Sequence, residues 1–232
     1  IRSPDGYILD MTPKTITLEA GKTLQVEFTN TAKPGLQLLK LDKVTGKPIK
    51  SAMFSVVQLL SGAKKDLGTF TTGEGGTFYI PDLASGDYII TEIKAAEGYI
   101  LDTTPKNIYM EEGKLNTVEF YNIPYGNLRL QKIDSETRTP LEGAIFKLYD
   151  EKRLEIGTYT TSALGEINVS KLPSGNYFIQ EVNAPAGYLL DNTVRSIELL
   201  PGKTTTVEIK NEPLGSLRII KVDAGTGKPL YG

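Results

Sequence analysis

Three polar residue types recur in this sequence where a strand pattern calls for an apolar side chain. In a strand, alternate residues point to the same face. Lys132, Glu181 and Asn211 each fall in phase with the apolar residues of a separate alternating run. Earlier copies of these runs carry the same residue types at the equivalent positions, which are Lys40, Glu92 and Asn122. We therefore expect two sets of lysine, glutamate and asparagine to point inward.

A buried lysine, glutamate and asparagine can react with one another. An isolated buried charge is destabilising by several kcal/mol unless it is paired or neutralised. Burial lowers the pKa of an amine and raises that of a carboxylic acid, which favours a neutral, nucleophilic amine beside a protonated acid. Such an acid can polarise the asparagine carbonyl and pass a proton to departing ammonia. The expected product is a lysine–asparagine isopeptide bond. The alternative is that each residue lies at a strand end and reaches solvent.

The composition excludes most other catalytic chemistry. The 232 residues include no His and no Cys, which removes thiol nucleophiles, Ser-His-Asp triads, disulfides and zinc sites built from these residues. Asp and Glu are scattered, so we expect no metal site and no cofactor. With 26 Lys+Arg against 28 Asp+Glu, the chain offers no basic surface for nucleic acid. No apolar run reaches the roughly 18 residues of a membrane span, so we expect no membrane insertion.

The sequence is a tandem repeat. Residues 4–30, 96–122 and 185–211 align without gaps. A second triplet begins at Leu36, Leu128 and Leu217 and repeats with the same offsets. We therefore expect two complete repeats, the C-terminal part of a preceding repeat and the N-terminal strand of a following repeat, at 36–124, 128–213, 1–33 and 216–232 respectively.

Each repeat has the pattern of short strands. Runs rich in Val, Ile, Thr, Tyr and Phe alternate with polar residues and are punctuated by Gly, Pro and Asp. A helical turn is compatible with the pattern only after residue 94 or around residue 102. Seven short strands at this spacing indicate an all-β sandwich. In the first complete repeat the strands are predicted at 36–42, 53–59, 67–72, 76–80, 87–94, 107–111 and 116–122.

The repeats also resemble a known family. The segments that carry the resemblance are SGDYIITEIKAAEGYILD (85–102), NTVEFYN (116–122), SGNYFIQEVNAPAGYLLD (174–191) and TTVEIKN (205–211). They are similar to the B-type (Cna B-like) repeat of Gram-positive collagen adhesins and to the SpaA-type prealbumin-like domains of sortase-assembled pilins. The first repeat departs from the family pattern at Ala95–Ala96, where Ala-Pro is usual, and the second departs at residues 137–140, where TRTP replaces TGKP.

The resemblance implies a fold and a set of reactive residues. The fold is a transthyretin-like (inverse immunoglobulin-like) seven-stranded β-sandwich in each complete repeat. The implied intramolecular bonds join a lysine of the first strand to an asparagine of the last strand, and a glutamate promotes each bond. These residues are Lys40, Asn122 and Glu92 in the first repeat and Lys132, Asn211 and Glu181 in the second.

The partial repeats contain two further copies of the reactive residue types. Asn30 lies in the first partial repeat and Lys221 in the last, and neither segment supplies an equivalent glutamate. We therefore expect Asn30 and Lys221 to remain unpaired in this chain.

The resemblance implies a structural function. We expect stalk repeats of an extracellular adhesin attached to the cell wall of a Gram-positive bacterium, with crosslinks that resist force and proteolysis. The reaction would be a single autocatalytic turnover, so the chain is not expected to be an enzyme. The expected partners are neighbouring repeats and, through other domains of the parent, host extracellular matrix. One alternative is a ligand-binding module for host matrix or glycan, and another is a backbone pilin subunit.

Overall fold

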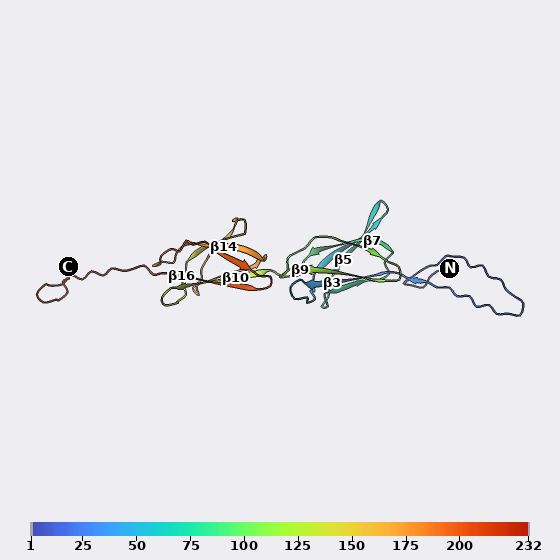
Figure 1. The fold of residues 1–232 in the computed structure, drawn as a ribbon, viewed down its shortest axis with the longest axis horizontal. Coiled ribbons are helices and arrows are strands. Elements are labelled where there is room, and N and C mark those ends of the chain that lie inside the picture. Colours follow the sequence, from blue (N-terminus) through green and yellow to red (C-terminus); the bar gives the residue numbers. More distant parts are fainter. Residues whose placement is uncertain (1, 232) are drawn as a thin grey trace. The chain divides into compact units, whose positions relative to one another are not determined.

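The computed structural model describes residues 2–231, and every regular element within that range is a β-strand (Figure 1). The chain divides into two compact units, residues 1–125 and 126–232. Each unit contains a three-stranded mixed sheet and a four-stranded antiparallel sheet. The two sheets enclose an apolar core. The prediction of tandem seven-stranded all-β sandwiches is confirmed.

The sandwich of the first unit uses strands β3 to β9. One sheet has the order β6-β3-β9 and the other has the order β5-β4-β7-β8. The first and last strands of the sandwich, β3 and β9, are parallel neighbours, and Figure 1 shows them side by side. The seven strands are β3 (Gly35–Asp42), β4 (Met53–Leu60), β5 (Ala63–Thr71), β6 (Thr77–Ile80), β7 (Gly86–Lys94), β8 (Lys106–Met110) and β9 (Leu115–Asn122).

The sandwich of the second unit repeats this topology. Its sheets have the orders β13-β10-β16 and β12-β11-β14-β15, and β10 pairs with β16 in parallel. As in the first unit, the first and last strands of the sandwich are therefore neighbours in the same sheet. The strands are β10 (Gly126–Asp134), β11 (Ile145–Tyr149), β12 (Glu155–Thr160), β13 (Glu166–Leu172), β14 (Gly175–Asn183), β15 (Arg195–Leu199) and β16 (Thr204–Asn211).

The terminal segments form little regular structure. In the first segment, β1 (Tyr7–Ile8) pairs with β2 (Thr31–Ala32), and residues 9–30 contain no strand. After residue 213 the described chain has one isolated bridge, Val222↔Pro229. The same kind of bridge occurs in both sandwiches, at Leu41↔Pro48 and Ile133↔Pro140. The terminal segments therefore keep local turns of the repeat without its sheets.

Strand β5 is longer than the sequence pattern predicted. It begins at Ala63, after a turn whose Gly62 has a φ of 78°, whereas the predicted strand began at residue 67. The added residues include Lys64 and Lys65, which are exposed on the edge of the four-stranded sheet. Lysine is common on edge strands because it discourages pairing with another chain. This polar run concealed the start of the strand.

The core of each sandwich comes from residues on the inner faces of both sheets. In β3 the alternation is strict, because Leu36, Leu38 and Lys40 are all 0% exposed. Phe54 of β4 contacts Phe120 of β9 edge to face, with ring centroids 4.9 Å apart. The lysine side chain thus lies on the same buried face of β3 as the two leucines, and side chains of both sheets pack together in the core.

One glycine in each sandwich lies directly against the lysine of the first strand. Gly76 and Gly165 each have a φ of 69°, and their carbonyl oxygens accept the backbone N–H of Lys40 and Lys132 at 2.7 Å. A Cβ on Gly76 would lie 2.6 Å from the Lys40 carbonyl oxygen, and a Cβ on Gly165 would overlap that of Lys132. Only glycine suits both the backbone conformation and the close approach.

Replacing Gly165 with alanine should destabilise the second sandwich more than the same change at Gly143. Gly143 also has a positive φ, 83°, but no atom lies within 4 Å of the position that a Cβ would take there. Gly143→Ala should therefore lose only the ~1–2 kcal/mol of the left-handed conformation. Gly165→Ala should lose a further ~1–3 kcal/mol because the added methyl group collides with the Lys132 strand. Urea unfolding of both variants measures this, and equal losses would contradict the steric argument.

Candidate functional site

Neighbouring strands bring the lysine and asparagine of each repeat together. In the parallel ladder of β3 and β9, Lys40 lies opposite Phe120 and Asp42 lies opposite Asn122. Because Lys40, Asp42 and Asn122 share the inward face, the lysine reaches one step along the ladder to the asparagine. Glu92 comes from β7 of the facing sheet. Lys40 and Glu92 are 0% exposed and Asn122 is 1% exposed.

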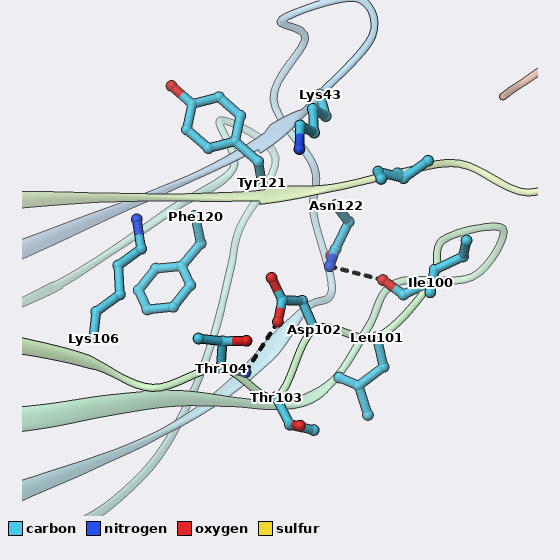
Figure 2. Close-up of a pocket in the computed structure, with 11 residues that line it drawn as sticks. Lys43, Ile100, Leu101, Asp102, Thr103, Thr104, Lys106, Phe120, Tyr121 and Asn122 are labelled. Carbon is cyan, nitrogen blue, oxygen red and sulfur yellow. Dashed lines mark hydrogen bonds between the residues drawn. The ribbon is translucent and has the colours of Figure 1, made fainter. Parts of the chain in front are cut away.

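In the first unit the glutamate lies between the two other residues. Lys40 Nζ is 3.7 Å from Glu92 Oε2. Asn122 Nδ2 donates to the same Glu92 oxygen at 2.7 Å and to the backbone carbonyl of Ile100 at 2.8 Å. Figure 2 shows the second of these bonds, with the asparagine side chain directed at Ile100. The backbone N–H of Asp102 also donates to Glu92 Oε2, at 3.4 Å.

The second unit has the same arrangement and one additional contact. Lys132 Nζ is 3.7 Å from Glu181 Oε1 and donates a hydrogen bond to Asn211 Oδ1. Asn211 Nδ2 donates to the Glu181 carboxylate at 3.0 Å and to the Leu189 carbonyl at 2.7 Å. The amine of the lysine therefore lies against the carboxamide that it would attack.

The first site leaves several buried polar atoms without hydrogen bonds. Among residues 2–231, the buried side-chain nitrogen and oxygen atoms that lack a partner are Lys40 Nζ, Glu92 Oε1 and Asn122 Oδ1. All three belong to this one cluster. An unpaired buried polar atom is destabilising by ~1–3 kcal/mol, so its presence calls for a chemical explanation.

Burial changes the protonation of both lysines. It lowers the pKa of Lys40 from 10.5 to about 8, against opposing effects of Glu92 and Asp102. The nearby Lys106 lowers the pKa of Lys40 further. Burial likewise lowers the pKa of Lys132, although Glu181 opposes the change. Each of these amines therefore loses its proton, and becomes nucleophilic, at a lower pH than the amine of an exposed lysine does.

An open cavity lies beside each asparagine. The first, of about 510 Å³, is lined by residues 100–104 of the loop, by residues 120–123 at the end of β9, and by Lys43 and Lys106 (Figure 2). The second, of about 570 Å³, is lined by Asn211, Leu189 and equivalent residues. Each asparagine, although almost fully buried, therefore forms part of the wall of an open cavity.

The residues of the partial repeats are not placed in such a site. Asn30 and Lys221 are both exposed and lie outside any strand. Within the described residues, no group of three or more His, Cys, Asp and Glu side chains could hold a metal ion. No helix between residues 2 and 231 is suited to crossing a bilayer.

Sequence reasoning missed the backbone groups that complete the site. The Ile100 and Leu189 carbonyls and the Asp102 and Asp191 amides all contact the asparagine or the glutamate. A backbone group carries no residue-type signal, so the triad pattern could not reveal it. The available signal was the repeated text GYILD and GYLLD, which marks the loop that supplies these groups.

Curated relatives of the chain are surface proteins of Gram-positive bacteria. The chain is 39% identical over 70 residues to the trypsin-resistant surface T6 protein of Streptococcus pyogenes serotype M6, which covers 30% of this chain and 13% of that protein. It is 32% identical over 103 residues to a collagen adhesin of Staphylococcus aureus, which covers 40% of this chain and 8% of that protein. The chain thus spans only a small part of each relative's length.

Solved structures of similar fold include a pilin. The shaft pilin SpaA of Lactobacillus rhamnosus GG, as a D295N mutant, is 17% identical, with a TM-score of 0.47 over 79% of this chain and 99% of that chain. The model of the SpaA family, described as a prealbumin-like fold domain, matches residues 34–124 and 126–213. The match of this family model to both sandwiches confirms the family resemblance. The chain belongs to the SpaA prealbumin-like fold domain family.

Proposed function

We propose that each complete repeat closes an intramolecular isopeptide bond and that the chain is part of the stalk of a cell-wall-attached surface adhesin. The bonds are Lys40–Asn122 and Lys132–Asn211. The observation that carries the proposal is the buried lysine, glutamate and asparagine cluster, which recurs in both sandwiches with the same 3.7 Å lysine–glutamate distance and an asparagine that donates to the glutamate.

The proposed reaction exchanges one amide for another. The neutral lysine Nζ attacks Cγ of the asparagine, and the bond from Cγ to Nδ2 breaks. The glutamic acid gives its proton to the departing nitrogen and accepts one from the attacking nitrogen, so it ends as it began. Ammonia leaves through the cavity that borders Asn122 or Asn211. Because the lysine and asparagine are consumed, each site reacts once and the chain is no turnover enzyme.

The position of the bonds suits a load-bearing role. Each bond joins the first strand of a sandwich to the last, so tension that enters at one end can leave at the other without unfolding the module. Lys132 and Asn211 are 79 residues apart. By analogy with disulfides, closing such a loop removes ~4–5 kcal/mol of unfolded-state entropy. One relative is named for its trypsin resistance, a property that this crosslink would confer.

The same proposal covers the partial repeats. We infer that residues 1–33 and 216–232 belong to a preceding and a following repeat, while 36–124 and 128–213 are complete. The Tyr7↔Ala32 pair of the first segment corresponds to Tyr99↔Pro124 in the first complete repeat. In the parent protein the partners of these repeats would be their neighbours in the stalk.

Intact mass provides the central test of the proposal. Since each bond releases one ammonia, the mature chain should weigh about 34 Da less than its sequence mass. Asn211→Ala should restore about 17 Da of that loss by preventing the second bond. Glu181→Ala should leave the second sandwich folded but not crosslinked, because the acid transfers protons and does not pair strands. A folded chain with an unchanged mass would refute the proposed function.

Asn30 and Lys221 should remain unmodified in the same preparation. Each is exposed and has no equivalent of Glu92 in its own partial repeat. Tryptic peptide mapping should recover both residues in linear peptides. A crosslinked peptide that contains Lys221 and Asn30 would show that the glutamate is unnecessary or that the repeat boundaries are wrong.

Where the bond is prevented, the buried amine should make stability depend on pH. In Asn122→Ala, Lys40 stays titratable, and its folded-state pKa of about 8 lies below the ordinary value of 10.5. Between these values the unfolded chain binds more protons, so the free energy of unfolding should rise with pH, by ~3 kcal/mol in total. The control is Asn122→Ala combined with Lys40→Met, which lacks this contribution. Urea unfolding at pH 8 and 10.5 compares the two, and equal pH dependence would contradict the lowered pKa.

A further inference from the structure

A loop with the sequence Gly-Tyr-x-Leu-Asp borders the reactive cluster in each sandwich. It begins at Gly98 in the first unit and at Gly187 in the second, where φ is 87° and 86°. The residue after the tyrosine supplies a carbonyl to the asparagine, and the aspartate supplies its backbone N–H to the glutamate. The loop thus contacts two members of each cluster through its backbone.

These contacts fix the orientation of the carboxamide. An asparagine side chain has two N–H donors and one carbonyl oxygen. In the second unit, Nδ2 of Asn211 donates both to Glu181 and to the Leu189 carbonyl, so both donors are engaged. The carbonyl oxygen then faces Lys132, which donates to it. Without the loop carbonyl, one donor would lose its partner and the carboxamide could rotate away from the amine.

The tyrosine of the loop connects it to the first strand. Tyr99 donates its hydroxyl hydrogen to Asp42 Oδ2 at 2.9 Å, and Tyr188 donates to Asp134 Oδ2 at 2.8 Å. Asp42 and Asp134 are each 5% exposed and lie two residues beyond the reactive lysine. In the parallel ladder Asp134 lies opposite Asn211. The hydrogen bond therefore connects the loop that holds the asparagine to the strand that carries the lysine.

Each aspartate is itself held in place. Asp134 Oδ1 accepts the backbone N–H groups of Glu136 and Thr137 at 2.7 and 2.8 Å, which leaves Oδ2 for the tyrosine. Hydrogen bonds from Thr137 and Tyr188 hold the pKa of Asp134 below its ordinary value. The hydrogen bond to Asp134 raises the pKa of Tyr188. At neutral pH a phenol thus donates to a carboxylate, which is a strong, charge-assisted hydrogen bond.

We propose that Tyr99 and Tyr188 are positioning residues for the crosslinking reaction, each acting through the loop backbone that orients the asparagine carboxamide. This inference rests on the proposed function. Each tyrosine hydroxyl donates to an aspartate of the first strand and not to a reacting residue, so its effect on the reaction is indirect. They hold the loop carbonyl at the distance where it fixes the carboxamide toward the attacking nitrogen.

The test compares two tyrosine hydroxyls of the second sandwich. Tyr188→Phe removes the hydrogen bond to Asp134, whereas the control Tyr177→Phe removes one of 2.8 Å to the Pro173 carbonyl. Chains freshly made by cell-free synthesis are sampled over time, and tryptic peptides report each bond separately. Tyr188→Phe should slow the Lys132–Asn211 bond roughly tenfold, the scale expected for one charge-assisted hydrogen bond.

An internal reference is present in every molecule. The Lys40–Asn122 bond of the first sandwich should form at the same rate in all variants, because none of the substitutions touches it. Tyr177→Phe should leave both bonds at the rate of the unsubstituted chain. If Tyr188→Phe and Tyr177→Phe slow the second bond equally, a positioning role for Tyr188 is excluded.

A second measurement separates positioning from general destabilisation. Both substitutions are repeated in Lys132→Ala, which cannot form the second bond, and urea unfolding gives their effects on stability. If Tyr188 is a positioning residue, Tyr188→Phe should slow the second bond by more than its loss of folding stability, relative to Tyr177→Phe, can explain. If the rates of the two variants simply follow their stabilities, the positioning role is overturned. An unsubstituted chain that loses no ammonia refutes the proposed function and this inference together. Ammonia loss with no specific effect of Tyr188→Phe refutes this inference alone.

Discussion

The burial of a lysine amine between two sheets is the constraint on which each sandwich depends. Lys40 and Lys132 are 0% exposed, and each occupies a position that Leu would fill in an ordinary core. Burial lowers the pKa of both amines, and a glutamate of the facing sheet, 3.7 Å away, offsets part of that effect. The parallel pairing of first and last strands then sets an asparagine next to the same amine. The topology thus brings a buried amine, a carboxyl group and a carboxamide together.

Much of this arrangement could be predicted from the sequence because the repeat shows it more than once. The alternation in residues 128–134 set Lys132 in phase with the leucines, and the repeat placed Lys40 in the same phase on the inner face of β3. The prediction failed where the local pattern was polar, as in the lysine-rich start of β5. It also could not reach the groups contributed by the backbone. The Ile100 carbonyl accepts a hydrogen bond from Asn122 because of the path of the backbone, and the identity of residue 100 does not reveal this.

The same loop connects the reactive cluster to the segment that leaves the sandwich. After Asn122 the chain runs antiparallel to the loop, so that Ile123 accepts the N–H of Ile100 and Tyr125 donates to the Gly98 carbonyl. In the second unit, Glu212 accepts from Leu189 and Leu214 donates to Gly187. Tension applied to the exit segment is therefore first borne by the loop that orients the asparagine. In the proposed stalk, load transfer and the geometry of the cluster would share these hydrogen bonds.

The first partial repeat shows which part of this geometry is local. There, Lys33 donates to the Gly6 carbonyl and β1 pairs with β2, although residues 9–30 form no strand and Asn30 is exposed. The loop and the exit segment thus pair without the sheets of a complete sandwich. Burial of the asparagine differs, because it requires a first strand beside the last and a facing sheet that supplies the glutamate. The pairing of the loop with the exit segment is thus encoded within a short stretch of sequence, whereas the burial and orientation of the asparagine are seen only in the complete sandwiches.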